Sequence, residues 1–156
     1  VARPHIAHAL LQKGVVKSVR EAFEKYLGYR GKAYVPRELM TPEEAVSLLA
    51  ESGATVVLAH PMLIGCPPDE LEALIVHLKP YGLRALEAYH SEHSAADERV
   101  CVELAERHHL LLSGGSDFHG LSKPQVQLGK GHGGLRVSEA VLQRLKADRE
   151  ERGLPL

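Results

Sequence analysis

A carboxylate and an imidazole stand two positions apart in the glycine-rich segment 113–120, as Asp117 and His119. The segment follows the apolar run 110–112, which predicts a buried strand that leads into a loop. Residues i and i+2 of an extended segment point to the same side, so both side chains can face one point. An oxygen ligand beside an imidazole nitrogen suits Mn²⁺, Zn²⁺ or Fe²⁺. The alternative is that Asp117 caps a turn and His119 is a polar loop residue.

The elements that must position this segment alternate along the chain. Helical patterns at 41–53, 68–79 and 94–108 are each followed by an apolar strand pattern, at 55–59, 83–89 and 110–113. This order predicts a parallel α/β fold. A last amphipathic helix is expected from Ser138.

The first forty residues have a different pattern. Two helices are predicted over 3–13 and from Ser18 to about Leu27, followed by a basic loop at 28–32 and a short extended piece at 33–36. We therefore expect two parts, a helical unit over 1–40 and an α/β part over 41–156.

Each predicted strand ends at a side chain that can bind a metal. His60 follows the first strand, Glu87 and His90 stand at the end of the second, and Asp117 and His119 follow the third. In parallel sheets and barrels, sites form beyond the carboxyl ends of the strands. The sequence therefore predicts that His60, Asp117 and His119 form a metal site at one edge of the sheet.

Other interpretations remain open for some of these residues. His60 would otherwise be a core histidine bonded to a carbonyl, and Glu87 is expected to orient a histidine rather than to bind metal directly. His90 and His93 are expected to be solvent-exposed loop residues.

Arg3 and His5 at the start of the first helix are candidates for a phosphate site. A helix N-terminus and a forked guanidinium together bind anions. The alternative is a surface arginine beside a capping histidine.

The bulk composition is that of an ordinary globular protein, with 44% hydrophobic and 25% charged residues among 156. The formal net charge of −1 gives no argument for nucleic-acid or membrane binding, although it would not exclude a local basic groove. No apolar run is long enough for a membrane helix. Cys66 and Cys101 do not suggest a disulfide framework, so a cytoplasmic location is expected.

Three motifs together carry a resemblance to a known family. They are Leu-Ala-His-Pro at 58–61, Gly-Ser-Asp-Phe-His-Gly at 115–120 and Arg-Pro-His-Ile-Ala at 3–7. The chain resembles the PHP (polymerase and histidinol phosphatase) family from about residue 3 to residue 129. The most similar branch contains phosphoesterases that act on nucleoside 3′,5′-bisphosphates and short RNA ends.

The resemblance implies a distorted TIM-like (β/α) barrel that holds up to three divalent ions, most often Mn²⁺, with Fe²⁺ or Zn²⁺ as alternatives. It places His60, Asp117 and His119 at ligand and catalytic positions. Arg3 and His5 match the substrate-phosphate motif of a helical insertion that acts as a lid. A metal-activated water would attack the phosphorus of a nucleotide or a short oligonucleotide.

The chain departs from the family at its start, because the opening His-x-His strand and the segments that follow it are absent. We therefore expect a C-terminal fragment, a partial barrel whose partner would be the missing N-terminal half, and an inactive protein when that half is absent. Two other functions are considered, a non-catalytic PHP-type scaffold and a histidinol-phosphatase-like phosphatase.

Overall fold

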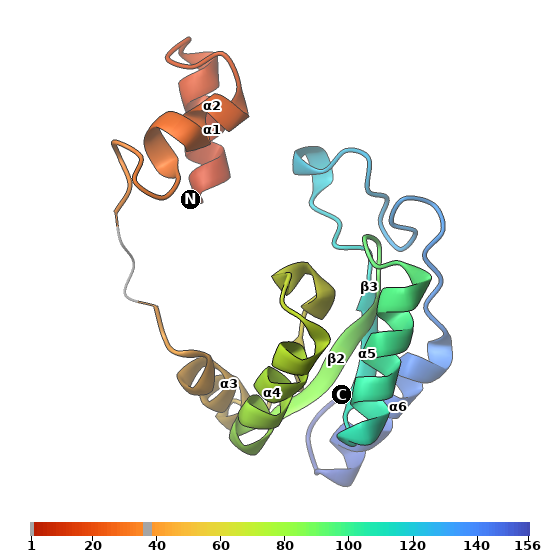
Figure 1. Cartoon of the computed structure of the whole chain (residues 1–156). Helices are drawn as coiled ribbons and strands as arrows, with labels where there is room; N and C mark the ends of the chain where they lie inside the picture. Colours follow the sequence, from red (N-terminus) through yellow and green to blue (C-terminus); the bar gives the residue numbers. More distant parts are fainter. Residues whose placement is uncertain (1, 36–38) are drawn as a thin grey trace. The chain divides into compact units, whose positions relative to one another are not determined.

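The structure is a computed structural model that describes residues 2–35 and 39–156. The chain divides into two compact units, Val1–Leu39 and Met40–Leu156 (Figure 1). Each unit is described by itself below.

The first unit consists of short helices around a small apolar core. It contains α1 (Arg3–Gln12), α2 (Val19–Ala22) and the π-helix η1 (Phe23–Leu27). The buried residues of its core are Ala7, Val16, Ala22 and Leu27.

The second predicted helix of this unit changes type halfway along its length. Ser18 caps it as expected, since its Oγ accepts a hydrogen bond of 3.0 Å from Glu21 N. After Ala22 the backbone widens, and Gly28 N donates to Phe23 O, five residues earlier, over 2.7 Å. The end of the predicted α-helix is therefore a π-helix, the rarer form with i to i+5 hydrogen bonds.

The loop that follows turns back onto η1. Lys32 N donates to Lys25 O over 3.0 Å, and Ala33 N donates to Tyr26 O over 2.9 Å. The expected extended piece over 33–36 is therefore wrong at its start, where residues 32 and 33 form a turn, and its end at Pro36 lies outside the described residues.

The second unit has the predicted alternation of helices and strands. Its elements are α3 (Pro42–Glu51), β1 (Val56–Leu58), η2 (Pro61–Ile64), α4 (Pro68–Leu78), η3 (Lys79–Tyr81), β2 (Leu83–His90), α5 (Ala95–Arg107), β3 (Leu111–Gly115), η4 (Gly120–Ser122) and α6 (Glu139–Glu151). Local caps define the helix starts. At α3, Thr41 Oγ1 accepts from Glu44 N, and the Glu44 carboxylate accepts from Thr41 N over 2.8 Å.

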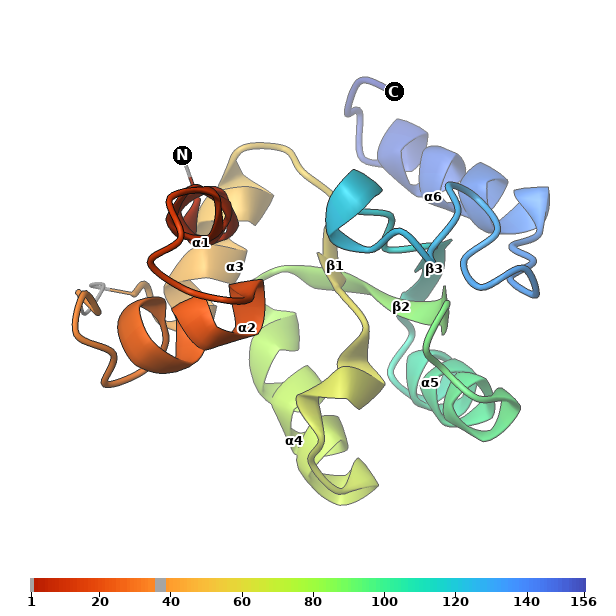
Figure 2. The same cartoon turned by 90° about the horizontal axis from the view of Figure 1, so that it is seen from above.

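The three strands form one parallel sheet in the order β1-β2-β3. Leu58 pairs with Leu86, and His90 pairs with Gly115. Because both pairings are parallel, the carboxyl ends of all three strands lie at the same edge. Helices α3, α4, α5 and α6 are arranged around the sheet in chain order (Figure 2).

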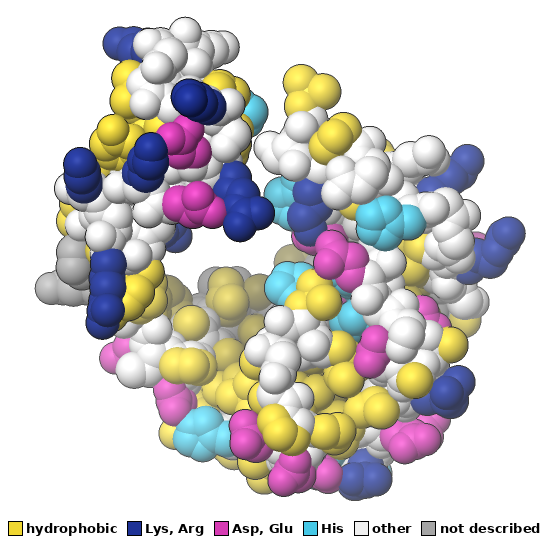
Figure 3. All heavy atoms as spheres, turned by 45° about the horizontal axis from the view of Figure 1, so that its top comes forward, with side chains coloured by type: hydrophobic (Ala, Val, Ile, Leu, Met, Phe, Trp, Pro, Cys, Tyr) yellow, Lys and Arg dark blue, Asp and Glu magenta, His cyan; other side chains and the backbone are white. Residues whose placement is uncertain are grey.

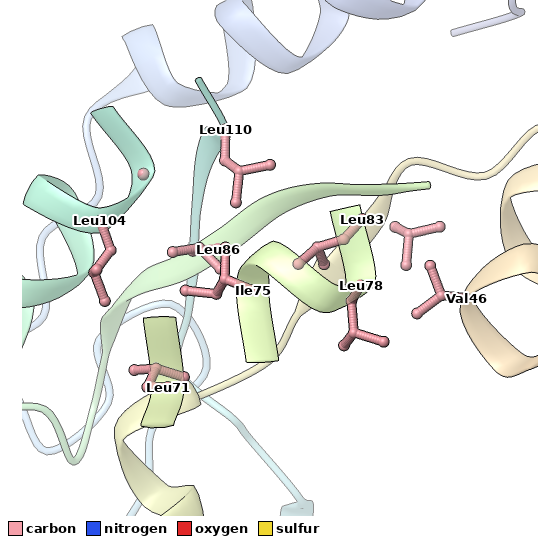
Figure 4. Close-up of a cluster of buried hydrophobic side chains, with 10 residues drawn as sticks. Val46, Leu71, Ile75, Leu78, Leu83, Leu86, Leu104 and Leu110 are labelled. Atoms are coloured by element: carbon pink, nitrogen blue, oxygen red, sulfur yellow. The ribbon is translucent and has the colours of Figure 1, made fainter. Parts of the chain in front are cut away.

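The core of this unit lies between the sheet and helices α3, α4 and α5 (Figure 4). Its buried residues are Val46, Val56, Leu71, Ile75, Leu78, Leu83, Leu86, Leu104, Ala105 and Leu110. Burial of these apolar side chains fixes the sheet against the helices, and so fixes the positions of the strand ends.

The predicted class, α/β with a parallel sheet, is confirmed. Within residues 2–35 and 39–156 the sheet has three strands and does not close on itself. No helix of this described part has the length and apolar character needed to cross a membrane.

Candidate metal centre at the strand ends

His60 stands directly beyond β1 in a left-handed conformation, with φ 33°. Its backbone N–H donates a hydrogen bond of 2.8 Å to Oε2 of Glu87 on the neighbouring strand β2. Such a φ is uncommon for a residue other than glycine. The Glu87 carboxylate therefore helps to hold the exit of β1, and it does so through the His60 backbone rather than through an imidazole ring.

His90 is the last residue of β2 and is only 2% exposed. Its ring centroid lies 5.5 Å from that of His60, and its Nε2 lies 3.9 Å from Oδ2 of Asp117. The expectation that His90 is solvent-exposed is wrong, because β2 continues to residue 90 and carries the ring into the interior. His90 thus links the first strand exit to the third.

The tautomer of His90 follows from its contacts. Nδ1 accepts a hydrogen bond of 3.1 Å from the backbone N–H of Glu92. A neutral ring that accepts at Nδ1 carries its proton on Nε2. That buried Nε2 has no hydrogen-bond partner among the described residues and lies on the Asp117 side of the ring. Burial lowers the pKa of His90, which favours the neutral form.

His93 has the opposite tautomer. Its Nδ1 lies 2.8 Å from Ala88 O, and a carbonyl only accepts, so Nδ1 carries the proton. The Nε2 atom therefore presents a lone pair; it is buried and has no hydrogen-bond partner in the described part of the chain. The His93 ring lies 5.1 Å from the His90 ring, between centroids. The expectation of a solvated His93 holds only in part, because the residue is half-buried and its Nε2 is fully buried.

Asp117 follows β3 with φ 52°, so the backbone there is not extended. Its Oδ2 accepts a hydrogen bond of 2.6 Å from Lys123 Nζ, and Lys123 also contacts Glu92 Oε1 at 3.2 Å. The Lys123 ammonium lowers the pKa of Asp117, and the carboxylate is ionised at neutral pH. The sequence interpretation missed Lys123, because no periodicity or motif spacing relates it to Asp117.

His119 lies beside Asp117 through a local turn. Its Nδ1 is 2.7 Å from the backbone oxygen of Asp117 and 3.5 Å from Oδ1 of the same residue. The side chain is 56% exposed. The two predicted residues are therefore close together, but the cause is a turn rather than the alternation of an extended strand.

The loop that carries these residues is tied to β2. Ser91 Oγ donates to Ser116 O over 2.6 Å, and Ser116 Oγ accepts from Gly129 N over 3.2 Å. Gly115 leaves room for the Glu87 carboxylate, since a Cβ at this position would lie 3.0 Å from Oε1 of Glu87. The close spacing of β2 and β3 thus depends on small residues at the end of β3.

Arg3 and His5 belong to the first unit. Arg3 Nη1 donates to Leu27 O over 3.4 Å, and His5 Nδ1 accepts from Ala2 N over 3.0 Å, which caps the helix start. Arg3 also lines a cavity of about 430 Å³ with apolar neighbours that include Ile6 and Leu27. Both side chains are exposed. The capping interpretation therefore holds for His5 Nδ1, while the guanidinium of Arg3 has room for a ligand.

The strand-end residues have the chemistry that a divalent ion requires. Imidazole and carboxylate suit Mn²⁺, Fe²⁺ and Zn²⁺, and the buried lone pair of His93 Nε2 has no hydrogen-bond partner within residues 2–35 and 39–156. Figure 3 shows His side chains beside acidic ones and a basic one on the second unit. The donor types fit a metal, but the described residues contain no group of three or more His, Cys, Asp or Glu arranged to hold one.

A parallel α/β sheet with imidazoles and a carboxylate at its carboxyl edge defines a class of proteins that includes many metal-dependent hydrolases. No family model matches the chain. It is 34% identical over 130 residues to the 5′-3′ exoribonuclease Rnm of Escherichia coli, which covers 83% of the chain and 44% of that protein. It is also 34% identical over 119 residues to a 3′,5′-nucleoside bisphosphate phosphatase of Chromobacterium violaceum, which covers 76% of the chain and 42% of that protein.

A solved structure is similar over almost the whole chain. It is a protein of Bifidobacterium adolescentis, provisionally named a metal-dependent phosphoesterase, with a TM-score of 0.70 and 28% identity over 94% of this chain and 50% of the other. The chain spans less than half the length of the two curated relatives named above. These comparisons confirm the resemblance seen in the motifs: the chain is a relative of PHP-type phosphoesterases of the bisphosphate phosphatase and exoribonuclease branch.

Proposed function

We propose that this chain is part of a metal-dependent phosphoesterase that hydrolyses phosphate monoesters of nucleotides, either nucleoside 3′,5′-bisphosphates or short RNA ends. The observation that carries this proposal is that His90 lies next to both His60 and Asp117, which brings the first and third strand exits to one place. The names of the relatives support the reaction class and the kind of substrate.

In this proposal His60, Asp117 and His119 hold divalent ions, with Mn²⁺ first and Fe²⁺ or Zn²⁺ as alternatives, up to three in the complete protein. His93 adds a buried imidazole nitrogen that can accept a proton or a metal. A bound divalent ion would supply Lewis-acid stabilisation and a water of lowered pKa. Glu87 accepts a hydrogen bond from the His60 backbone N–H, and this bond restricts the positions that the His60 ring can take.

The neighbours of Asp117 keep its carboxylate charged and oriented. Lys123 donates to Oδ2, and the Nε2–H of neutral His90 faces the same oxygen at 3.9 Å. Arg3 would bind a substrate phosphate through its forked guanidinium, with His5 at the same helix start. Both residues would act on the ground-state substrate, so their loss should raise KM more than it lowers kcat.

We also infer that the three-stranded sheet is part of a distorted TIM-like barrel and that residues 1–156 alone do not form a complete three-metal centre. Two observations support this. The described residues offer no group of three donors. In addition, Leu48 and Leu49 of α3 are 55% and 49% exposed, although the helical pattern predicts an inward face for both. Further barrel elements would cover such apolar side chains.

The test uses the complete protein, stripped of metal and then supplied with Mn²⁺. We expect release of inorganic phosphate from adenosine 3′,5′-bisphosphate, and loss of at least about 100-fold of that activity in Asp117→Asn, which removes a charge and preserves shape. Asp69→Asn is the matched control, since Asp69 is exposed in the first turn of α4. No phosphate release with Mn²⁺, Fe²⁺ or Zn²⁺ would reject the proposal, and unchanged turnover in Asp117→Asn would remove Asp117 from the site.

Two alternatives remain as outcomes of that test. A non-catalytic scaffold is favoured by one observation, that Lys123 forms an ion pair with Asp117. It predicts no metal binding by the complete protein. A histidinol-phosphatase-like activity would show turnover of histidinol phosphate in preference to the nucleotide. The proposal includes a cytoplasmic location, in keeping with Cys66 and Cys101, which are both free thiols.

A further inference from the structure

The charges of the chain are divided unequally between its two units. Residues 1–39 hold eight Lys and Arg against three Asp and Glu, a formal charge of +5, whereas residues 40–156 hold eleven against seventeen, a charge of −6. The overall charge of −1 conceals this division. Figure 3 shows Lys and Arg side chains spread over the surface of the first unit. A small unit with this excess of positive charge attracts polyanions.

Within this unit the acidic side chains that the structure describes are already paired. Glu24 binds Arg20 at 2.7 Å, and Glu21 binds Lys25 at 2.5 Å. Across residues 2–35, no carboxylate is paired with Arg30 or Lys32, and both side chains are exposed. The loop that follows η1 therefore presents two cations that have no acidic partner in the described part of the chain.

An exposed aromatic ring stands in the same loop. Tyr29 is 77% exposed, and its ring packs edge-on against Tyr34 with centroids 5.7 Å apart. The guanidinium carbon of Arg30 lies 5.3 Å from the centroid of Tyr29. A large aromatic side chain left this exposed beside a guanidinium is the arrangement on which bases of single-stranded nucleic acid stack, while the cations bind the phosphates.

The loop is held in one shape before any ligand binds. Gly31 N donates to Gly28 O over 2.8 Å, Tyr34 N donates to Gly31 O over 2.9 Å, and Lys32 N donates to Lys25 O over 3.0 Å. Gly31 packs so closely that a Cβ there would lie 2.4 Å from Tyr26 O. Arg30 itself has φ 65°, in the left-handed region that residues other than glycine seldom adopt. Ordering of the loop in advance reduces the entropy lost on binding.

We propose that the loop formed by Tyr29, Arg30 and Lys32 is a binding surface for single-stranded nucleic acid, with a base stacked on Tyr29 and backbone phosphates on Arg30 and Lys32. This inference goes beyond phosphate-ester hydrolysis, because it assigns to the first unit a binding activity that needs no metal and no turnover. It deepens the proposed function on one point: a substrate that reaches this loop is an oligonucleotide rather than a mononucleotide.

The test is a binding measurement on the 156-residue chain in EDTA, so that metal and turnover play no part. A fluorescent single-stranded RNA of twelve nucleotides is titrated at several salt concentrations, and anisotropy gives the dissociation constant. For the double variant Arg30→Gln with Lys32→Gln, we expect the slope of log K against log salt to be shallower by about 1.4, since each phosphate contact on a single strand contributes about 0.7. Arg99→Gln is the control, an exposed cation on α5.

The stacking role is tested at Tyr29. We expect Tyr29→Ala to weaken RNA binding about 5-fold or more, and Tyr29→Phe, which keeps the ring, to bind within about 2-fold of the unaltered chain. Tyr81→Ala, at an exposed position in η3, should have no effect. Circular dichroism of each variant shows that the fold is retained.

Three results would overturn the inference: no RNA binding at low salt, RNA binding that is insensitive to Tyr29, or binding to anionic phospholipid vesicles that is tighter than binding to RNA. Single-stranded DNA, tested in parallel, shares the same chemistry, and equal affinity for it supports the inference. RNA binding without phosphate-ester hydrolysis by the complete protein would reject the proposed function and leave this inference standing. Hydrolysis of the mononucleotide without RNA binding would reject this inference and leave the proposed function standing.

Discussion

Oε2 of Glu87 on β2 accepts a hydrogen bond of 2.8 Å from the backbone N–H of His60, which lies 27 positions earlier in the chain, at the exit of β1. This bond joins two strand ends and helps to hold His60 at its positive φ. Glu87 is half-buried, so the N–H that it satisfies would find little water in its absence. The position of one candidate metal-binding side chain thus depends on a carboxylate of the adjacent strand.

Replacement of Glu87 should therefore act first on the free energy of unfolding and only through it on catalysis. We expect Glu87→Ala to lower the free energy of unfolding by about 2 kcal/mol, since it leaves a partly buried N–H without an acceptor. Glu87→Gln keeps an acceptor oxygen and should cost less than about 1 kcal/mol. Urea denaturation measures both, with Glu103→Ala on the exposed side of α5 as control. Equal stability of Glu87→Ala and Glu103→Ala would show that the bond is unimportant.

Lys123 should compete with a divalent ion for Asp117, because its ammonium lies 2.6 Å from Oδ2. In Lys123→Met the carboxylate loses its nearest cation. We expect the affinity of the complete protein for Mn²⁺ to rise about tenfold, which corresponds to about 1.4 kcal/mol. The free Mn²⁺ signal in electron paramagnetic resonance measures this affinity. Lys130→Met, an exposed position, controls for the change in net charge, and an equal affinity in both variants would argue against Asp117 as a ligand.

Gly114 should tolerate no side chain. A Cβ at this position would lie 2.7 Å from the Cβ and 2.8 Å from the backbone oxygen of Tyr89, on the paired strand. The contact involves backbone, so the sheet itself must shift, and we expect Gly114→Ala to cost about 3 kcal/mol in urea denaturation. Gly134→Ala has open space around the new methyl group and should be nearly neutral. A Gly114→Ala protein as stable as Gly134→Ala would contradict the observed pairing of β2 with β3.

The ion pair of Arg84 with Asp148 should make the free energy of unfolding depend on pH in the acidic range. Asp148 is 5% exposed, its Oδ1 accepts from Arg84 Nε over 2.8 Å, and its pKa is lowered below the usual 3.8 mainly by this hydrogen bond. A carboxylate with a lowered pKa in the folded state stabilises the fold above its unfolded pKa, and this contribution disappears as the pH falls through the folded value. Stability should therefore fall as the pH is lowered through and below the usual pKa of an aspartate.

In Asp148→Asn this part of the acid dependence should disappear, and the variant should be less stable at pH 7 by about 2 kcal/mol. The expected loss is smaller than for a fully buried pair because the Arg84 side chain is 45% exposed. Asp69→Asn controls for the loss of one carboxylate. An acid profile of Asp148→Asn identical to that of the unaltered protein would contradict this assignment.

Much of the fold could be predicted because its signals are local. Thr41 and Ser94 cap helices within four residues of sequence, and apolar runs bounded by glycine or proline mark the strands. A parallel order of strands then places His60 and Asp117 at the same edge, whatever their separation along the chain. The prediction that His60 and Asp117 lie at one edge of the sheet required only the alternation of helices and strands.

What could not be predicted depends on tertiary contacts. Burial of His90 requires β2 to extend one residue further than its apolar pattern, and pairing of His90 with Gly115 decides that. The partnership of Lys123 with Asp117 depends on the path of the loop after η4, which no pattern in the sequence defines. The change from α-helix to π-helix at Phe23 occurs where the next loop returns onto η1, a contact that no pattern in the sequence marks.

We propose that His60 and Asp117 hold the same metal cluster at the edge of a parallel sheet. The most direct measurement is the anomalous diffraction of crystals of the complete protein grown with Mn²⁺, recorded at the manganese absorption edge. We expect anomalous peaks at the strand ends, within bonding distance of His60 Nε2 or Nδ1 and of an Asp117 carboxylate oxygen. Manganese bound only elsewhere on the protein, or His60 and Asp117 in separate pockets without metal, would contradict it.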